Sequence, residues 1–217
     1  STRLSGFLGN SGARKAAFLP DQVRPGNTAG DEWVNAYGMV FCWCPDKDGG
    51  FWMGKYEVTK REFNAVTRKN PRNSLAVRNN HPRDGVHYDD IINFVRQINQ
   101  RERFFKRVPE GWEYGLPTES QWVRAASADE PPKDLAKHAN FADASLFNTG
   151  DNFYHYAVRD QNDQHPFLAI VGSYPANSMG IHDLLGNVWE WTDTYSNAHL
   201  NPKKPGNPIP CGGSWVS

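Results

Sequence analysis

A polar stretch in the second half of the chain limits the possible folds more than any other feature. Between residues 129 and 180, hydrophobic residues follow no sustained helical or strand period, and only "LAIVGSY" (168–174) is expected to be a strand. Segments of this length without regular structure are uncommon in compact domains. Something other than an apolar core must therefore fix the stretch, and a bound metal ion would do so.

The first half of the chain has clear signals for regular structure. The β-prone runs "YGMVFCWC" (37–44) and "FWMGKYEV" (51–58) flank the turn-rich "PDKDGG", which predicts a hairpin. Thr59 and Glu62 have the spacing of a capping box, so a helix is expected to begin there. With 8 Trp, 19 Gly and 15 Pro, the composition favours irregular loops packed around aromatic anchors.

Two further helices are expected. Ile91, Val95 and Ile98 recur at helical spacing within 80–104, and Thr118 with Gln121 forms a second capping box. No alternation of strands and helices indicates a doubly wound sheet. The pattern therefore predicts an α+β fold with low regular secondary structure.

Charge and hydropathy exclude two classes of function. The chain has 24 basic and 24 acidic residues and no basic block, so the electrostatic footprint of a nucleic-acid-binding protein is missing. It has no apolar run long enough to span a membrane. The sequence names no compartment, and an extracytoplasmic one is favoured.

The three cysteines leave two alternatives open. Cys42 and Cys44 are expected on the same face of a strand, where their spacing strains a direct bridge. Cys211 could pair with one of them, or all three thiols could be free. An odd count leaves at least one thiol free or paired with another chain.

Glu190 raises the sharpest chemical question, because it stands between Trp189 and Trp191 in "GIHDLLGNVWEWTDTY" (180–195). A carboxylate among large apolar rings needs a partner. The alternatives are a metal ion, or hydrogen bonds from backbone amides or an arginine.

Five segments in order resemble one family. "MGKYEVTKREF", "NHPRDGVHYDDIINFVRQIN", "GWEYGLPTESQWVRAAS", "GIHDLLGNVWEWTDTY" and "GGSW" are similar to motifs of the formylglycine-generating enzyme, or sulfatase-modifying factor, family. The resemblance covers about residues 37–215 and implies a variant of the C-type-lectin fold. Residues 1–30 show no sustained period and are rich in Gly, Ser and Pro, so an irregular N-terminal arm is expected there, before a domain over 31–217.

The resemblance also implies one or two structural calcium ions. The first site would take side-chain oxygens of Asp183 and Glu190 and the carbonyls of Gly186 and Val188. The second would take side-chain oxygens of Asn140 and Asp163 and the carbonyls of Phe141 and His165. Calcium prefers such oxygen ligands in flexible geometry.

The family's oxidase chemistry is not expected in this chain. That copper-dependent reaction uses two cysteines after "GGSW", whereas this sequence closes with "CGGSWVS" at Ser217, so no catalytic residue is assigned and the closing part of the family fold is expected to be absent. The sequence therefore favours a calcium-stabilised binding or structural module with a protein or peptide partner. Alternatives are part of a copper-dependent oxidase that converts a substrate cysteine to formylglycine, or a fold completed by a second chain.

Overall fold

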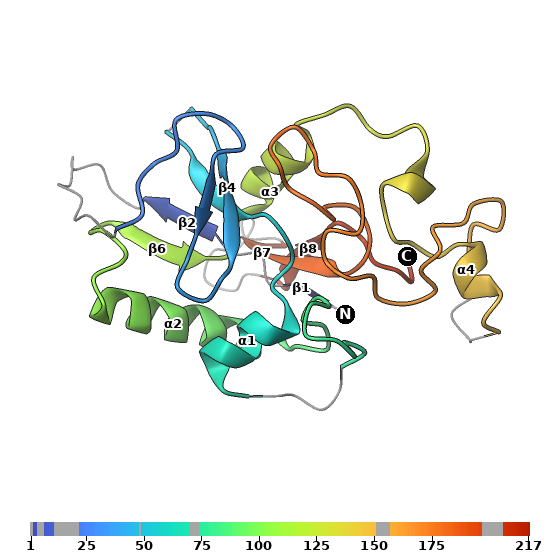
Figure 1. The fold of residues 1–217 in the computed structure, drawn as a ribbon, viewed down its shortest axis with the longest axis horizontal. Coiled ribbons are helices and arrows are strands. Elements are labelled where there is room, and N and C mark those ends of the chain that lie inside the picture. The colour runs from blue at the N-terminus through green and yellow to red at the C-terminus, as the bar shows by residue number, and fades with distance from the viewer. Residues whose placement is uncertain are drawn as a thin grey trace.

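The computed structural model describes residues 2–3, 7–10, 22–47, 49–69, 74–150, 157–196 and 206–217. These residues form two β-sheets and a set of short helices, and long loops make up most of the second half of the chain (Figure 1). The predicted α+β class is therefore confirmed. None of the described helices is both long and apolar enough to cross a bilayer.

The larger sheet has five strands in the order β3–β4–β5–β2–β6, and each neighbouring pair is antiparallel. These strands are β2 (Phe7–Asn10), β3 (Glu32–Val34), β4 (Val40–Cys44), β5 (Phe51–Gly54) and β6 (Trp112–Gly115). The predicted hairpin is confirmed, because β4 pairs with β5 across the "PDKDGG" turn region.

The N-terminal stretch differs in part from the expected irregular arm. Residues 22–30 are irregular, but β2 is an inner strand, paired with β5 and β6. Four residues are too few to show a period, and both partner strands come much later in the sequence. Residues 1, 4–6 and 11–21 of the expected arm lie outside the described residues, and the division at residue 30 stays a prediction.

The smaller sheet has three strands in the order β1–β7–β8. In it, β1 (Thr2–Arg3) is parallel to β7 (Trp189–Tyr195), which is antiparallel to β8 (Pro208–Cys211). Glu190 faces Cys211 in the register of β7 and β8. The motif that contains the two tryptophans therefore becomes the central strand of this sheet.

Three helices begin where local sequence signals place them. Helix α1 (Lys60–Thr67) has the predicted capping box, in which Thr59 Oγ1 accepts the Glu62 N–H at 3.3 Å and Glu62 Oε2 accepts the Thr59 N–H at 2.9 Å. Helix α3 (Glu119–Ala126) has the second predicted box. Helix α2 (Tyr88–Phe104) buries the predicted Ile91 and Ile98.

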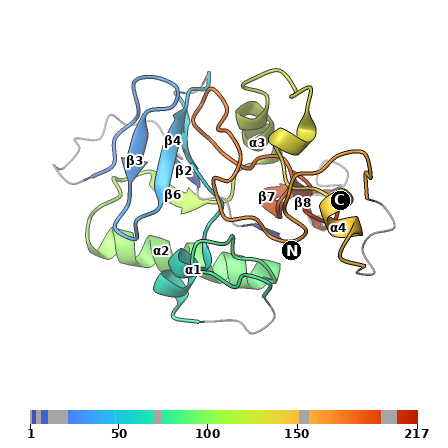
Figure 2. The same ribbon diagram turned by 45° about the vertical axis from the view of Figure 1, so that its right-hand side comes forward.

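The larger sheet separates two apolar clusters. Along β4, Phe41 and Trp43 point into the cluster shared with α1 and α2, while Cys42 and Cys44 point into a second cluster with α3. Helices α1 and α2 lie side by side along one side of the larger sheet in both views (Figures 1 and 2). The prediction that Cys42 and Cys44 share a face is confirmed.

The loop region contains only η1 (Leu135–Lys137) and α4 (Ala144–Phe147) as described helices. The prediction of a strand at 168–174 was wrong, because these residues form turns and irregular structure. Their amides bond to distant loops instead of a neighbouring strand. Ala169 N–H donates to Asn187 Oδ1, and Val171 N–H donates to the Asn80 carbonyl.

Candidate metal sites

Asn187 is the centre of a fully buried polar network. Its Nδ2 atom lies 3.0 and 3.1 Å from the two carboxylate oxygens of Glu57, and its Oδ1 accepts from Asn140 Nδ2 and the Ala169 amide, each at 3.0 Å. Its backbone N–H donates to the Asn140 carbonyl at 2.7 Å. We call Glu57, Asn140, Ala169 and Asn187 the Asn187 network. It joins three segments that are far apart in the sequence.

The Gly186-Asn187 pair is required by the local backbone. Their φ angles are 76° and 56°, and these left-handed values suit glycine and asparagine. A Cβ atom on Gly186 would lie 2.0 Å from the Asn140 carbonyl oxygen, so only glycine permits this approach. The pair thus brings the two predicted calcium-binding loops into contact.

At the first predicted site, the carboxylates of Glu190 and Asp183 accept hydrogen bonds from different parts of the chain. Glu190 is completely buried, and its Oε2 accepts a hydrogen bond from the Trp122 indole of α3 at 2.8 Å. Asp183 is 4% exposed and accepts the N–H of Gly172. An indole is a donor that the sequence analysis did not consider for Glu190. Metal binding by Asp183, Gly186, Val188 and Glu190 stays a prediction.

At the second predicted site, one carboxylate connects two loops. Asp163 Oδ2 accepts the Phe141 N–H at 2.9 Å, and Oδ1 accepts the His165 N–H at 2.8 Å. The structure therefore brings together Phe141, Asp163 and His165, with Asn140 directly before Phe141. Burial is the main cause of a raised pKa of the Asp163 carboxyl.

Three oxygen atoms of the residues at the second predicted site accept no hydrogen bond from the described residues. Asn140 is fully buried, and its Oδ1 has no hydrogen-bond partner among the described residues, although its Nδ2 donates to Phe167 O and Asn187 Oδ1. The carbonyls of Phe141 and His165 likewise accept no hydrogen bond from the described residues. A buried acceptor without a donor is unfavourable. Oxygen atoms are the ligands that a hard cation takes, and metal binding by Asn140, Phe141, Asp163 and His165 stays a prediction.

The predicted calcium sites differ from metal centres that are built from side chains alone. No group of three or more His, Cys, Asp or Glu side chains suited to a metal occurs in the described part of the chain. Each predicted site instead combines two side-chain oxygens with two backbone carbonyls. Calcium accepts such mixed ligands, whereas zinc sites usually need several His or Cys ligands.

Sequence reasoning missed a second buried carboxylate beside Asp163. Asp143 is fully buried, accepts the Ser145 N–H at 2.7 Å and also accepts the Asp163 N–H. It is the N-cap of α4, and an Asp just before "ASLF" is a recognisable cap signal. Asn187 and Glu57 were also missed, and their separation of 130 residues left no local signal for their contact.

The three cysteines are free and belong to the protein interior. Cys42 and Cys44 are buried, and Cys211 is half-buried against the same apolar cluster. Burial is the main cause that raises the thiol pKa values to about 11, 12 and 11, respectively. Of the two alternatives left by the sequence, the structure shows three unpaired thiols.

A cavity of about 860 Å³ lies beside Asp183, between the segment that follows α3 and residues 175–185. Its wall carries the carboxylates of Asp129, Glu130 and Asp183, and no Lys or Arg side chain is among the described residues that line it. Ile181, Leu184 and Leu185 provide apolar surface. The cavity is therefore negatively charged with an apolar part.

Taken together, the chain has a mixed fold with few helices, whose long loops are joined by buried asparagine and carboxylate side chains. Residues 46–217 match the family model described as the sulfatase-modifying factor enzyme 1-like domain. The chain belongs to this family. The match confirms the resemblance carried by the sequence motifs.

Curated relatives have two kinds of names. Chaperone protein LppX of Paenibacillus barcinonensis is 28% identical over 206 residues, which are 77% of this chain and 70% of that protein. A formylglycine-generating enzyme of Mycobacterium tuberculosis is 30% identical over 134 residues, and one of Mus musculus is 25% identical over 154. Those matches cover 59% and 62% of this chain, but only 39% and 34% of the enzymes.

Two solved structures share the fold. PvdO from Pseudomonas aeruginosa has a TM-score of 0.57 at 19% identity, with 88% of each chain covered. Treponema denticola variable protein 1 has a TM-score of 0.58 at 17% identity, with 85% of this chain and 87% of that one covered. At these identities the similarity supports the fold, and function must be argued from the site.

Proposed function

We propose that this chain is a calcium-stabilised binding module of the sulfatase-modifying factor family. The buried Asn140 Oδ1 carries the proposal, because it has no hydrogen-bond partner among the described residues. Asn140 and Asp163, with the Phe141 and His165 carbonyls, would hold one ion. Asp183 and Glu190, with the Gly186 and Val188 carbonyls, would hold the other.

A bound calcium ion would supply positive charge where the fold concentrates buried oxygen atoms. Its stabilising effect would come from fixing loops with little apolar burial, because any ligand that binds only the folded state adds to stability. The Asn187 network would then transmit this constraint, since Asn140 contacts both Asn187 and the loop that contains Phe167.

The binding role is supported by the cavity beside Asp183. The exposed Asp129 and Glu130 and the apolar side chains of the wall suit a protein segment or peptide that carries basic and apolar residues. The partner is therefore expected to be a protein or peptide of complementary charge.

Calorimetric titration of the chelator-treated chain with calcium chloride tests the metal proposal. We expect saturable binding at one or two sites, and weaker binding by Asn140→Ala. Asn79→Ala is the matched control, because Asn79 is exposed. Circular dichroism would verify that both variants are folded. No saturable heat from the wild-type chain, or equal affinity in all three proteins, would contradict the proposal.

A separate measurement tests the partner class. Fluorescence anisotropy would compare a short labelled Lys- and Leu-rich peptide with a Glu- and Leu-rich peptide of equal length. We expect the basic peptide to bind more tightly, and Asp129→Lys with Glu130→Lys to remove the difference. Equal binding of the two peptides by the wild-type chain would count against this cavity.

The similarity to enzymes named formylglycine-generating supports a second candidate, part of a copper-dependent oxidase acting on a protein cysteine. The three thiols of this chain do not favour it, because Cys42 and Cys44 are buried and Cys211 is half-buried, which limits the access of a protein substrate. We therefore expect no formylglycine formation by the chain after copper loading.

Incubation with a Cys-x-Pro-x-Arg peptide and oxygen, followed by mass spectrometry, tests the second candidate. Aldehyde formation that disappears in Cys211→Ser would support the oxidase. It would contradict our expectation that the chain forms no formylglycine. Cys44→Ser is a useful comparison because Cys44 is fully buried on β4 of the larger sheet, whereas Cys211 is half-buried on β8 of the smaller sheet.

A further inference from the structure

The C-terminal end of α2 exposes two adjacent aromatic rings. Phe104 and Phe105 are 79% and 57% exposed, and their ring centroids lie 5.1 Å apart in an edge-to-face arrangement. We call residues 101–107 the α2 tip. Single exposed apolar residues are ordinary on protein surfaces, whereas a contiguous aromatic pair indicates an interaction site.

Backbone hydrogen bonds fix the shape of the α2 tip. Phe105 N–H donates to the Arg101 carbonyl at 3.1 Å, and Lys106 N–H donates to the Arg103 carbonyl at 3.0 Å. Lys106 has a left-handed φ of 55°, as at many helix ends. The two rings are therefore presented on an ordered turn.

Arg107 anchors the same turn from the inside. Its Nη1 lies 2.9 Å from Oε1 of the fully buried Glu102, and its backbone N–H donates to the Glu102 carbonyl at 2.9 Å. Its guanidinium carbon lies 4.5 Å from the centroid of the Phe105 ring. These contacts hold Phe105 on the surface beside a cation.

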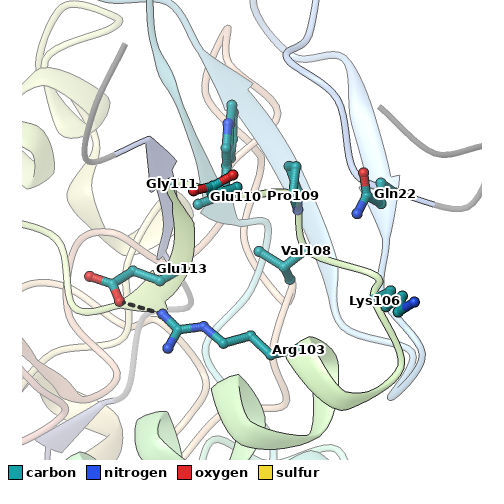
Figure 3. A pocket seen from close by; sticks show the side chains of 9 residues that line it. Gln22, Arg103, Lys106, Val108, Pro109, Glu110, Gly111 and Glu113 are labelled. Atoms are coloured by element: carbon teal, nitrogen blue, oxygen red, sulfur yellow. Dashed lines mark hydrogen bonds and ion pairs between the residues drawn. The ribbon is translucent and has the colours of Figure 1, made fainter. Parts of the chain in front are cut away.

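Basic side chains outnumber acidic ones in the α2 tip, although Arg103 pairs with Glu113 and Arg107 pairs with Glu102. Residues 101–107, "RERFFKR", contain four basic side chains and one acidic side chain, in a chain whose total charge is balanced. The acidic side chain is the buried Glu102. Arg103 lies 3.0 Å from Glu113 and is directed toward it in Figure 3. The same view shows Lys106 in another part of the wall of a cavity that the α2 tip forms with Gln22 and residues 108–113. Lys106 forms no ion pair with any described residue.

We propose that the α2 tip docks this protein onto a membrane surface that contains anionic phospholipids. Phe104 and Phe105 would enter the boundary between headgroups and acyl chains, and Lys106, which has no ion pair among the described residues, would contact a lipid phosphate. Protruding rings flanked by cations need no matching pocket on a bilayer, and this favours a membrane over a protein partner. The proposal requires no membrane-spanning helix.

Vesicle co-sedimentation of the full chain tests this assignment. The vesicles would contain phosphatidylcholine alone, or phosphatidylcholine mixed with phosphatidylglycerol. We expect binding to the mixed vesicles, and a loss of about tenfold or more in affinity for Phe104→Ser with Phe105→Ser. The control is Leu75→Ser with Val77→Ser, because these side chains are 51% and 82% exposed elsewhere on the surface.

A charge variant separates the two parts of the interaction. Lys106→Glu should weaken binding to the mixed vesicles by about fivefold or more. Added salt should also weaken the binding of the wild-type chain to these vesicles, because salt screens the attraction between charges. Melting temperatures equal to that of the wild-type chain would show that the variants remain folded.

Three outcomes would overturn the proposal. They are no binding of the wild-type chain to either vesicle, equal binding of the wild-type chain and the phenylalanine variant, or an equal loss of binding in the control variant. Capture of a protein through Phe104 and Phe105 without vesicle binding would assign the α2 tip to a protein partner and would also contradict the membrane proposal.

Discussion

At the scale of single residues, Asn187 performs a structural task that few side chains can perform. Its amide nitrogen donates to Glu57, its amide oxygen accepts two hydrogen bonds, and its backbone adopts φ 56°. Asparagine tolerates this left-handed conformation and offers both a donor and an acceptor. The donor and acceptor of the Asn187 side chain both have partners, and such buried hydrogen bonds can specify one arrangement of the surrounding loops.

Asn187→Ala should therefore destabilise the protein by about 3 kcal/mol or more, because it removes several buried hydrogen bonds and leaves their partners in the interior. Urea unfolding measures this change. The exposed Asn79→Ala should change the free energy of unfolding by less than about 0.5 kcal/mol. Similar effects of the two substitutions would show that the Asn187 network contributes little to stability.

Glu190 offers a residue-scale test that separates a ligand from a core hydrogen-bonding group. Glu190→Gln should reduce the calcium dependence of melting much more than Glu119→Gln. Glu119 lies in the first turn of α3, where its charge contributes about 0.3–1 kcal/mol through the helix dipole. If both variants melt with the same calcium dependence as the wild-type chain, Glu190 serves as an acceptor for Trp122 and does not bind metal.

At the scale of elements, β4 and β8 determine the chemistry of the thiols. The alternation of β4 places both Cys42 and Cys44 in the cluster with α3, and β8 places Cys211 opposite Glu190. Each environment disfavours the charged thiolate, since burial is the main cause of each raised pKa.

The thiols should consequently react slowly with Ellman's reagent in the folded chain at pH 8, and all three should react quickly in urea. The rate should rise as the pH approaches 11. The free energy of unfolding should fall above pH 9, the ordinary thiol pKa, because the folded state retains these protons more tightly than the unfolded state. Rapid reaction of the native chain at pH 8 would indicate an accessible thiolate.

At the scale of the whole molecule, the apolar core is unevenly distributed. The cluster between the larger sheet and α1 and α2 contains many aromatic side chains, including Trp43, Trp52 and Phe63. The cluster beneath the loop region has fewer and smaller members: Ala76, Ala142, Leu146, Leu168, Val188 and Trp215. Because apolar burial stabilises in proportion to area, the loop half depends more on polar contacts and on any bound ion.

The sequence predicts the features that depend on neighbouring residues and misses those that depend on distant ones. Thr59 with Glu62, and Thr118 with Gln121, are local signals, and both helix starts are confirmed. By contrast, "LAIVGSY" resembles a strand, but its amides bond to Asn187 and Asn80. The strand β2 and the contact of Asn187 with Glu57 depend on residues far apart in the chain, so no local pattern indicates them.

We propose that calcium stabilises the loop half of this fold, and thermal melting in EGTA and in excess calcium tests this proposal most directly. If calcium binds only the folded chain, free calcium a hundredfold above its dissociation constant would add about 2.7 kcal/mol of stability. For a chain of this size, that corresponds to a rise of roughly 5–10 °C in Tm. We predict a higher Tm in calcium than in EGTA, and magnesium at the same concentration should not replace calcium fully. Identical melting temperatures in calcium and EGTA would contradict the account.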